Sequence, residues 1–229
     1  MIGIIGAMQE EIHEIEKLME VTEEKEEAGY RFFKGYLGCK EAVLVQGGIG
    51  KVNATISTTL LLKNYDIDHV INVGSAGGLK QDEEVGDIVI SEKVVHHDVD
   101  VTAFGREYGQ IPEMPVYFEA DQMLVEKAKQ ILEKNGSRAY AGLIASGDQF
   151  VHTAGQVDSI TSHFPEALCA EMEAASVAQV CFVFKKPFII TRGLSDIYNK
   201  GSNAIQFDEY LKKAAKMSAK MCYELAQAL

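Results

Sequence analysis

Short apolar runs alternate with segments of helical period along most of the chain. Runs of strand length lie at residues 2–5, 42–45, 70–73, 88–95, 143–145 and 188–191. Several of them are apolar on both faces, which is typical of strands in a sheet that helices cover on both sides. Residues 31–37 mix aromatic and polar side chains, and we expect them to pair with 42–45 as a hairpin around Gly38-Cys39-Lys40.

Helical patterns in the first half of the chain follow these runs. In residues 9–20 the apolar side chains, from Ile12 to Met19, fall on one face, which predicts an amphipathic helix. The acids at 23–27 are expected to form a solvated helix end or turn. Residues 51–64 predict a helix that is largely buried.

The second half continues the alternation of strands and helices. Asp121 is placed to cap a helix that Gly136 ends, and the apolar positions from Phe207 to Leu225 predict a C-terminal helix. No repeat, linker or low-complexity tract interrupts residues 1–229. The sequence therefore predicts an α/β fold, a single-domain three-layer α/β/α sandwich with a mixed central sheet.

Composition and charge exclude several classes of protein. With 229 residues, 47% of them apolar and 24% charged, the chain can bury a core without disulfides. No apolar run reaches the roughly 18 residues of a membrane helix. The net charge of −12 repels nucleic-acid phosphates, so we expect neither a membrane nor a nucleic-acid partner. The four cysteines lack CxxC spacing and the N-terminus lacks a signal-peptide pattern, which favours a cytoplasmic protein.

Three glycine clusters follow predicted strands, at residues 6–11, 47–52 and 74–78. In open α/β folds ligands bind beyond the carboxyl ends of strands, where glycine lets the backbone approach them. The alternative is that these glycines only form tight turns. The second cluster lacks the full pattern of a Walker A loop and the first lacks GxGxxG, so neither a nucleoside triphosphate nor a dinucleotide site is supported.

Polar residues in apolar surroundings give a stronger indication of function. Glu171 and Glu173 stand between an apolar run and an alanine-rich helix, Arg192 and Asp196 follow the run at 188–191, and Glu11 follows the first run. Each could be a surface charge or an acid at a helix start. Because all lie just past a strand, we expect them to converge on one cleft.

The sequence His96-His97-Asp98 resembles a cluster of metal ligands. Adjacent residues of a strand point to opposite faces, so the two histidines are poorly placed to share one ion. We expect no metal, and instead expect His97 or Asp98 to fix a loop through hydrogen bonds.

Seven motifs, in order along essentially the whole chain, resemble those of the bacterial 5′-methylthioadenosine/S-adenosylhomocysteine nucleosidases, within the nucleoside phosphorylase superfamily. They are Gly6-Ala7-Met8-x-Glu10-Glu11, Gly48-Ile49-Gly50-Lys51-Val52, Gly74-Ser75-Ala76-Gly77-Gly78, His97-Asp98-x-Asp100-Val101-Thr102-Ala103-Phe104-Gly105, Ser146-Gly147-Asp148-x-Phe150, Glu171-Met172-Glu173-Ala174 and Arg192-x-x-Ser195-Asp196. The resemblance implies hydrolysis of the adenine–ribose bond in 5′-methylthioadenosine, S-adenosylhomocysteine and 5′-deoxyadenosine. It implies roles in methionine salvage and the activated methyl cycle, and requires no cofactor.

The resemblance also implies roles for particular residues. Asp196 is the general acid that protonates adenine, and Glu173 holds the ribose hydroxyls. Glu11 deprotonates the attacking water with help from Arg192 and Ser75. Breaking an N-glycosidic bond through a cationic transition state needs such carboxylates and a proton donor.

Further residues are implied in substrate binding and assembly. Phe150 would stack on adenine and the Val151 backbone would contact its edge, and the remaining subsites would be lined by Met8, Ile49, Ser75, Met172, Ser195 and Phe207. The resemblance implies a homodimer, in which Val101, Phe104 and Pro112 reach the partner's site. For residues 101–118 the alternative is a loop packed on its own core.

Three other functions stay open on the sequence alone. A phosphorylase of the same fold would use phosphate in place of water, but phosphate sites recruit several basic side chains and only four arginines occur, at 31, 106, 138 and 192. A related hydrolase would act on another nucleoside. A non-catalytic sensor of an adenosine ligand would not need Glu11, Glu173 and Asp196 together.

Overall fold

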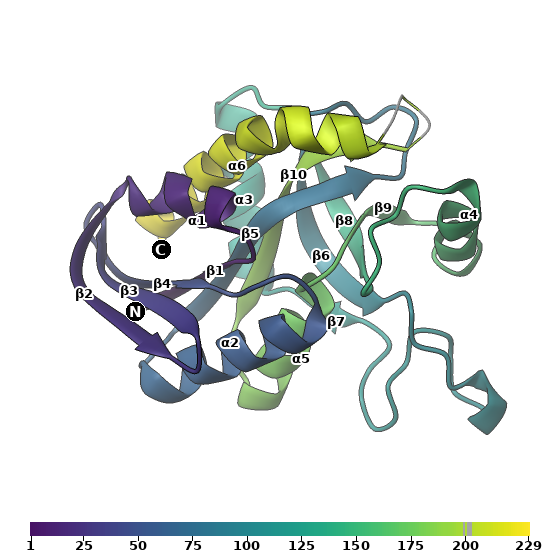
Figure 1. Ribbon diagram of the computed structural model, residues 1–229, viewed down its shortest axis with the longest axis horizontal. Helices are drawn as coiled ribbons and strands as arrows, with labels where there is room; N and C mark the ends of the chain where they lie inside the picture. Colours follow the sequence, from purple (N-terminus) through teal and green to yellow (C-terminus); the bar gives the residue numbers. More distant parts are fainter. Residues whose placement is uncertain (199, 201–202) are drawn as a thin grey trace.

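The structure, a computed structural model, describes residues 1–198, 200 and 203–229. One mixed sheet runs through it, with helices on both faces (Figure 1). The strands are β1 (Ile2–Gly6), β2 (Met19–Glu27), β3 (Tyr30–Leu37), β4 (Lys40–Gln46), β5 (His69–Gly78), β6 (Ile88–His96), β7 (Phe118–Glu119), β8 (Ala139–Ser146), β9 (Ala167–Glu171) and β10 (Phe188–Ile197). The helices are α1 (Gln9–Glu16), α2 (Lys51–Asn64), α3 (Gln122–Lys134), α4 (Ala154–His163), α5 (Ala174–Phe184) and α6 (Asn203–Ala228).

Among the described residues, two of the three apolar clusters separate the three layers and confirm the predicted sandwich. One core lies between the sheet and α2 and α5, and includes Leu61 and Cys181. The other lies under α1, α3 and α6 on the opposite face, and includes Ile12 and Leu124. Strands buried from both sides need apolar residues on both faces, which explains their continuous apolar runs.

The sheet closes on itself at one end, which the sequence did not indicate. β1 lies between β4 and β5 and is parallel to both. β10 pairs with β5 on one side and with β6 on the other, and the neighbours β6, β8, β9 and β5 complete a ring. β8 and β9 run antiparallel to β5 and β10 in this ring. The last residues of β8 and β9, Ser146 and Glu171, pair with each other, and Ala170 pairs with Gly77 of β5, so these strand ends meet the second half of β5.

Most of the expected elements are confirmed. The hairpin of β3 and β4 pairs Leu37 with Lys40. Asp121 caps α3 by accepting a hydrogen bond from the backbone N–H of Leu124, and Gly136 follows its end. The C-terminal helix spans Asn203–Ala228.

The prediction for residues 9–27 was wrong in part. The helix ends at Glu16, and Met19, expected on its apolar face, begins β2. The acids at 23–27 lie in this strand, not in a helix end or turn. β2 is held by antiparallel pairing with β3 at the edge of the sheet, and its acids face solvent. A tertiary contact therefore overrides the local helical pattern.

Helix α2 is less buried than expected. Ala54, Leu61 and Leu62 are buried, but Val52 is 70% and Ile56 39% exposed. The segment 101–118, which contains one short turn of helix at Thr102–Phe104, extends away from the body at the lower right of Figure 1. Phe104 on this segment is 83% exposed, so it does not pack on the core of its own chain.

Candidate active site

A cavity of about 290 Å³ opens at the carboxyl ends of the central strands. This is at the small end of the volumes known for small-molecule sites. Among the described residues its charged lining consists of acids alone, with no arginine, lysine or histidine. The full lining is Ala7, Met8, Glu11, Ile49, Ser75, Ala76, Gly77, Gln149, Phe150, Val151, Ala170, Glu171, Met172, Glu173, Ser195, Asp196 and Phe207.

Glu11 projects from the first turn of α1 and is buried. Its Oε2 accepts hydrogen bonds from the backbone N–H groups of Ala7 (2.9 Å) and Met8 (3.1 Å). Its Oε1 accepts from the N–H (2.9 Å) and the hydroxyl (3.1 Å) of Ser75 in β5. Four donors from two strand ends hold this carboxylate in one place at the wall of the cavity.

Glu173 lies between β9 and α5, with its carboxylate at the cavity. Its Oε1 accepts a hydrogen bond of 2.8 Å from the backbone N–H of Gly50, at the start of α2. Burial, followed by the negative charge of Glu171, raises the pKa of Glu173 to about 8. A positive charge that develops near this carboxyl group would favour its ionised form and lower its pKa.

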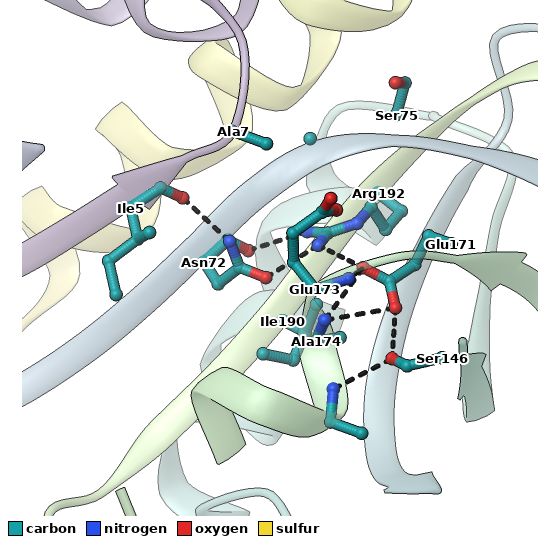
Figure 2. A network of polar contacts seen from close by, with 12 residues as sticks. Ile5, Ala7, Asn72, Ser75, Ser146, Glu171, Glu173, Ala174, Ile190 and Arg192 are labelled. Atoms are coloured by element: carbon teal, nitrogen blue, oxygen red, sulfur yellow. Dashed lines mark hydrogen bonds and ion pairs between the residues drawn. The ribbon is translucent and has the colours of Figure 1, made fainter. Parts of the chain in front are cut away.

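Glu171 and Arg192 form a buried ion pair behind Glu173 (Figure 2). The Glu171 carboxylate accepts from Arg192 Nη2 (2.6 Å), from the Ser146 hydroxyl, and from the backbone N–H groups of Glu173 (3.0 Å) and Ala174 (2.9 Å). In Figure 2 the Glu173 carboxylate points away from that of Glu171. The ion pair thus holds the backbone at Glu173 while leaving its side chain to the cavity.

Arg192 is 1% exposed and does not line the cavity. Besides Glu171, its Nη2 donates to Asn72 Oδ1 (2.6 Å), and Asn72 in turn donates to the carbonyl of Ile5. Gly74 separates Arg192 from Glu11, because a Cβ there would lie 3.3 Å from Arg192 Cζ and 3.0 Å from Glu11 Oε1. The guanidinium is therefore close to the acids but lies one layer beneath them.

Asp196 lies near the end of β10, where the strand departs from regular pairing. β10 runs to Ile197, so the prediction that Arg192 and Asp196 follow the strand was wrong, and both lie within it. Leu194 pairs with Ala76 and Asp196 with Gly77 of β5, so Ser195 is the extra residue of a bulge. The Ser195 hydroxyl lies 2.8 Å from Asp196 Oδ1 and 3.3 Å from the carbonyl of Ala76. Asp196 is 1% exposed, and the bulge turns its carboxyl group to the cavity.

Most of the residues expected in the site lie together. Glu11, Glu173 and Asp196 line one cavity with Met8, Ile49, Ser75, Phe150, Val151, Met172, Ser195 and Phe207. Phe150 meets Phe207 edge to face, with ring centres 5.7 Å apart. Arg192, Val101, Phe104 and Pro112 do not line it.

Sequence reasoning did not single out Gln149 or Ala170 as lining residues. Both neighbour motif residues, Phe150 and Glu171, and this proximity was the only signal that could have identified them.

Three further features bear on the expectations from the sequence. Among the described residues, no group of three or more histidine, cysteine, aspartate or glutamate side chains is arranged to hold a metal ion. None of the described helices is long and apolar enough to cross a membrane. Asp98 accepts hydrogen bonds from Lys51 Nζ and from the backbone of Asp148, which confirms that it fixes a loop.

Comparison with known proteins identifies the family. A family model described as the phosphorylase superfamily matches residues 1–227. A 5′-methylthioadenosine/S-adenosylhomocysteine nucleosidase of Geobacillus kaustophilus is 50% identical over 99% of this chain and 97% of its own.

Solved structures of similar proteins have the same fold as this chain. The same-named enzyme of Neisseria meningitidis, in complex with methylthio-immucillin-A, is 43% identical, with a TM-score of 0.96 over 100% of this chain and 99% of its own. A futalosine hydrolase of Helicobacter pylori is 38% identical, with a TM-score of 0.94 over 100% of this chain and 97% of its own. The chain belongs to the phosphorylase superfamily, and within it to the family of 5′-methylthioadenosine/S-adenosylhomocysteine nucleosidases.

Proposed function

We propose that the protein hydrolyses the N-glycosidic bond of 5′-methylthioadenosine and S-adenosylhomocysteine, and also that of 5′-deoxyadenosine. The products are adenine and, from the three substrates in turn, 5-methylthioribose, S-ribosylhomocysteine and 5-deoxyribose. This reaction links the enzyme to methionine salvage and the activated methyl cycle. The observation that carries the proposal is the convergence of Glu11, Glu173 and Asp196 on one cavity, in a chain 50% identical to such an enzyme.

Asp196 is the general acid of the proposed reaction. Adenine leaves poorly as an anion, so a proton must reach its N7 as the bond to ribose breaks. A buried carboxyl group held beside Ser195 can deliver that proton from a constant position. General acid catalysis of this kind contributes about 10²–10⁴-fold in rate.

Glu173 and Glu11 act on the sugar and on the water. Glu173 accepts hydrogen bonds from the ribose hydroxyls, and its negative charge offsets the positive charge that develops on the sugar. Glu11, fixed by Ala7, Met8 and Ser75, takes a proton from the attacking water. Arg192 acts from beneath, because its contacts are to Glu171 and Asn72 and not to the cavity.

The lining supports water as the nucleophile in place of phosphate. A phosphate dianion would enter a cavity whose described charged residues are all acids, with no basic side chain to neutralise it.

Phe150 stacks on the adenine, the Val151 backbone contacts its edge, and Met8, Ile49, Met172 and Phe207 face the sugar and its 5′ group. The proposal treats residues 1–229 as one domain, since one sheet runs through the described chain.

A homodimer completes the site in this proposal. α2 exposes Val52 and Ile56, and α5, which packs on α2, exposes Phe182. Phe104, which extends on the segment 101–118, reaches the partner's 5′ subsite together with Val101 and Pro112. The described cysteines are all free, which is consistent with a cytoplasmic enzyme.

The test is adenine release from 5′-methylthioadenosine by the purified protein, with and without phosphate. We expect the same rate in both conditions and free 5-methylthioribose as the second product. A rate that requires phosphate, with a sugar phosphate as product, would indicate a phosphorylase. Tight binding of the nucleoside without turnover would indicate a sensor.

A further inference from the structure

Three segments far apart in the sequence are joined beside the cavity by Asp98. Its Oδ1 accepts a hydrogen bond of 2.6 Å from Lys51 Nζ, in the first turn of α2. Its Oδ2 accepts one of 3.0 Å from the backbone N–H of Asp148, in the loop after β8. Asp148 Oδ1 in turn accepts from the backbone N–H of Lys51, at 2.8 Å, which closes a ring of three hydrogen bonds.

The ring grips the peptide that holds Glu173. Gly50 donates its backbone N–H to Glu173 Oε1, and the next N–H, that of Lys51, goes to Asp148. Gly50 has φ +92°, and a Cβ there would lie 2.9 Å from Asp148 Oδ1, so only glycine lets the two segments come this close. A movement of Asp148 would therefore move the Gly50 N–H, which orients the Glu173 carboxylate.

The ring is also attached to the adenine side of the cavity. Asp148 is followed by Gln149, Phe150 and Val151, all of which line the cavity. The backbone N–H of Asp148 donates to the Asp98 carboxylate, which also binds Lys51, the residue after Gly50. The positions of Phe150 and Gly50 therefore both depend on Asp98.

Asp98 is suited to this task because it stays ionised. Its side chain is 17% and that of Lys51 21% exposed. Burial alone would raise the pKa of Asp98, but the hydrogen bonds from Lys51 and Asp148 lower it below its usual value. Both of its oxygens accept from donors, so an asparagine at 98 would place an amide N–H₂ against one of them.

We propose that Asp98 is a positioning residue for the reaction, which holds the Phe150 loop and the Gly50–Glu173 contact as one rigid unit. The inference rests on the proposed function, since it concerns how the adenine and ribose subsites are kept in register. Asp98 does not line the cavity, so it acts through Asp148 and Lys51.

The test compares Asp98→Asn with Asp158→Asn, an exposed aspartate on α4 that serves as the matched control. We expect Asp98→Asn to lower kcat for 5′-methylthioadenosine about tenfold and to raise KM several-fold, with Asp158→Asn like the parent. Circular dichroism and thermal unfolding check the fold. If Asp98→Asn does not fold, Lys51→Met removes the same ion pair and leaves the Asp98–Asp148 contact in place.

A double-mutant cycle separates positioning from a general loss of stability. If Asp98 acts through the Gly50–Glu173 contact, Asp98→Asn should cost much less in kcat when Glu173→Gln is already present. Folded Asp98→Asn and Lys51→Met enzymes with parental kcat and KM, or costs that are fully additive with Glu173→Gln, would overturn the inference. A parent protein that releases no adenine would instead overturn the proposed function itself.

Discussion

Side chains are held differently in two regions of the molecule. One is the inner wall of the cavity, and the other is the outer face formed by α2 and the segment 101–118. On the wall, Glu11, Glu173 and Asp196 are all less than a tenth exposed, and each has a hydrogen-bond partner from another segment or a neighbouring hydroxyl. On the outer face, Phe104 and Val52 are 83% and 70% exposed. The carboxylates of the wall are held within one chain, whereas Phe104 and Val52 on the outer face are left uncovered by their own chain.

The two regions can therefore be tested separately. Carboxylates that are fixed by their own chain should affect the chemical step when they are changed. Apolar side chains that no part of the chain covers should affect assembly and substrate affinity.

The largest effect is expected for Asp196→Asn. Asparagine keeps the shape and a hydrogen bond to Ser195 but cannot transfer a proton, so kcat should fall by about 10²–10⁴-fold while the fold survives. The measurement is adenine release by the purified variant, with circular dichroism as the control for folding. Activity within tenfold of the parent would mean that another group donates the proton.

A smaller loss is expected for Glu173→Gln. The charge that Glu173 offsets develops only in the transition state, so kcat should fall by about 10²-fold while KM changes little. Steady-state kinetics with 5′-methylthioadenosine separate the two constants. Equal rates for variant and parent would show that Glu173 only precedes helix α5 and takes no part in the reaction.

Changes on the outer face should act through assembly. Val52→Glu places a charge on the exposed side of α2, and we expect it to convert a dimer into monomers and to raise KM about tenfold through loss of the partner's Phe104. Light scattering at micromolar concentration reports the oligomeric state. Lys63→Gln, at the far end of the same helix, also lowers the net charge by one unit and is the control for the change in charge. A parent protein that is a fully active monomer would contradict the dimer.

The smallest effect concerns a buried carboxyl group away from the cavity. Glu83 is fully buried, its Oε1 meets no donor among the described residues, and burial raises its pKa to about 7. Between its usual value of 4.5 and 7, the folded chain retains a proton that the unfolded chain releases. Stability is therefore lost as the pH rises through this window, and the loss is complete above it.

Glu83→Gln should remove that dependence on pH. We expect Tm at pH 8 to rise by about 2–4 °C, with kcat unchanged, and the parent and variant to converge near pH 4.5. Thermal unfolding across this range measures it. A folded variant that loses activity would show that Glu83, in the loop between β5 and β6, contributes to the reaction although it lies outside the cavity.

Local patterns predicted much of the fold because they report burial directly. The strands at 2–5 and 188–191 are apolar on both faces, which requires helices on both sides. β2 escaped prediction because its residues are held by pairing with β3, and nothing within residues 19–27 shows that partner. The site residues were identified through a family resemblance, and the structure brings eleven of the expected residues to one cavity.

The sequence alone places acids and an arginine near the ends of apolar runs, because glycine and polar residues mark where such a run ends. Which of them share a cavity depends on how the strands pair in three dimensions. Pairing in the ring brings the ends of β8 and β9 to the second half of β5, and the bulge at Ser195 directs Asp196 inward. The side chain of Arg192, in the same strand as Asp196, points away from the cavity to Asn72 and Glu171. Side-chain direction depends on pairing register, and register is a property of two strands, so a single segment does not encode it.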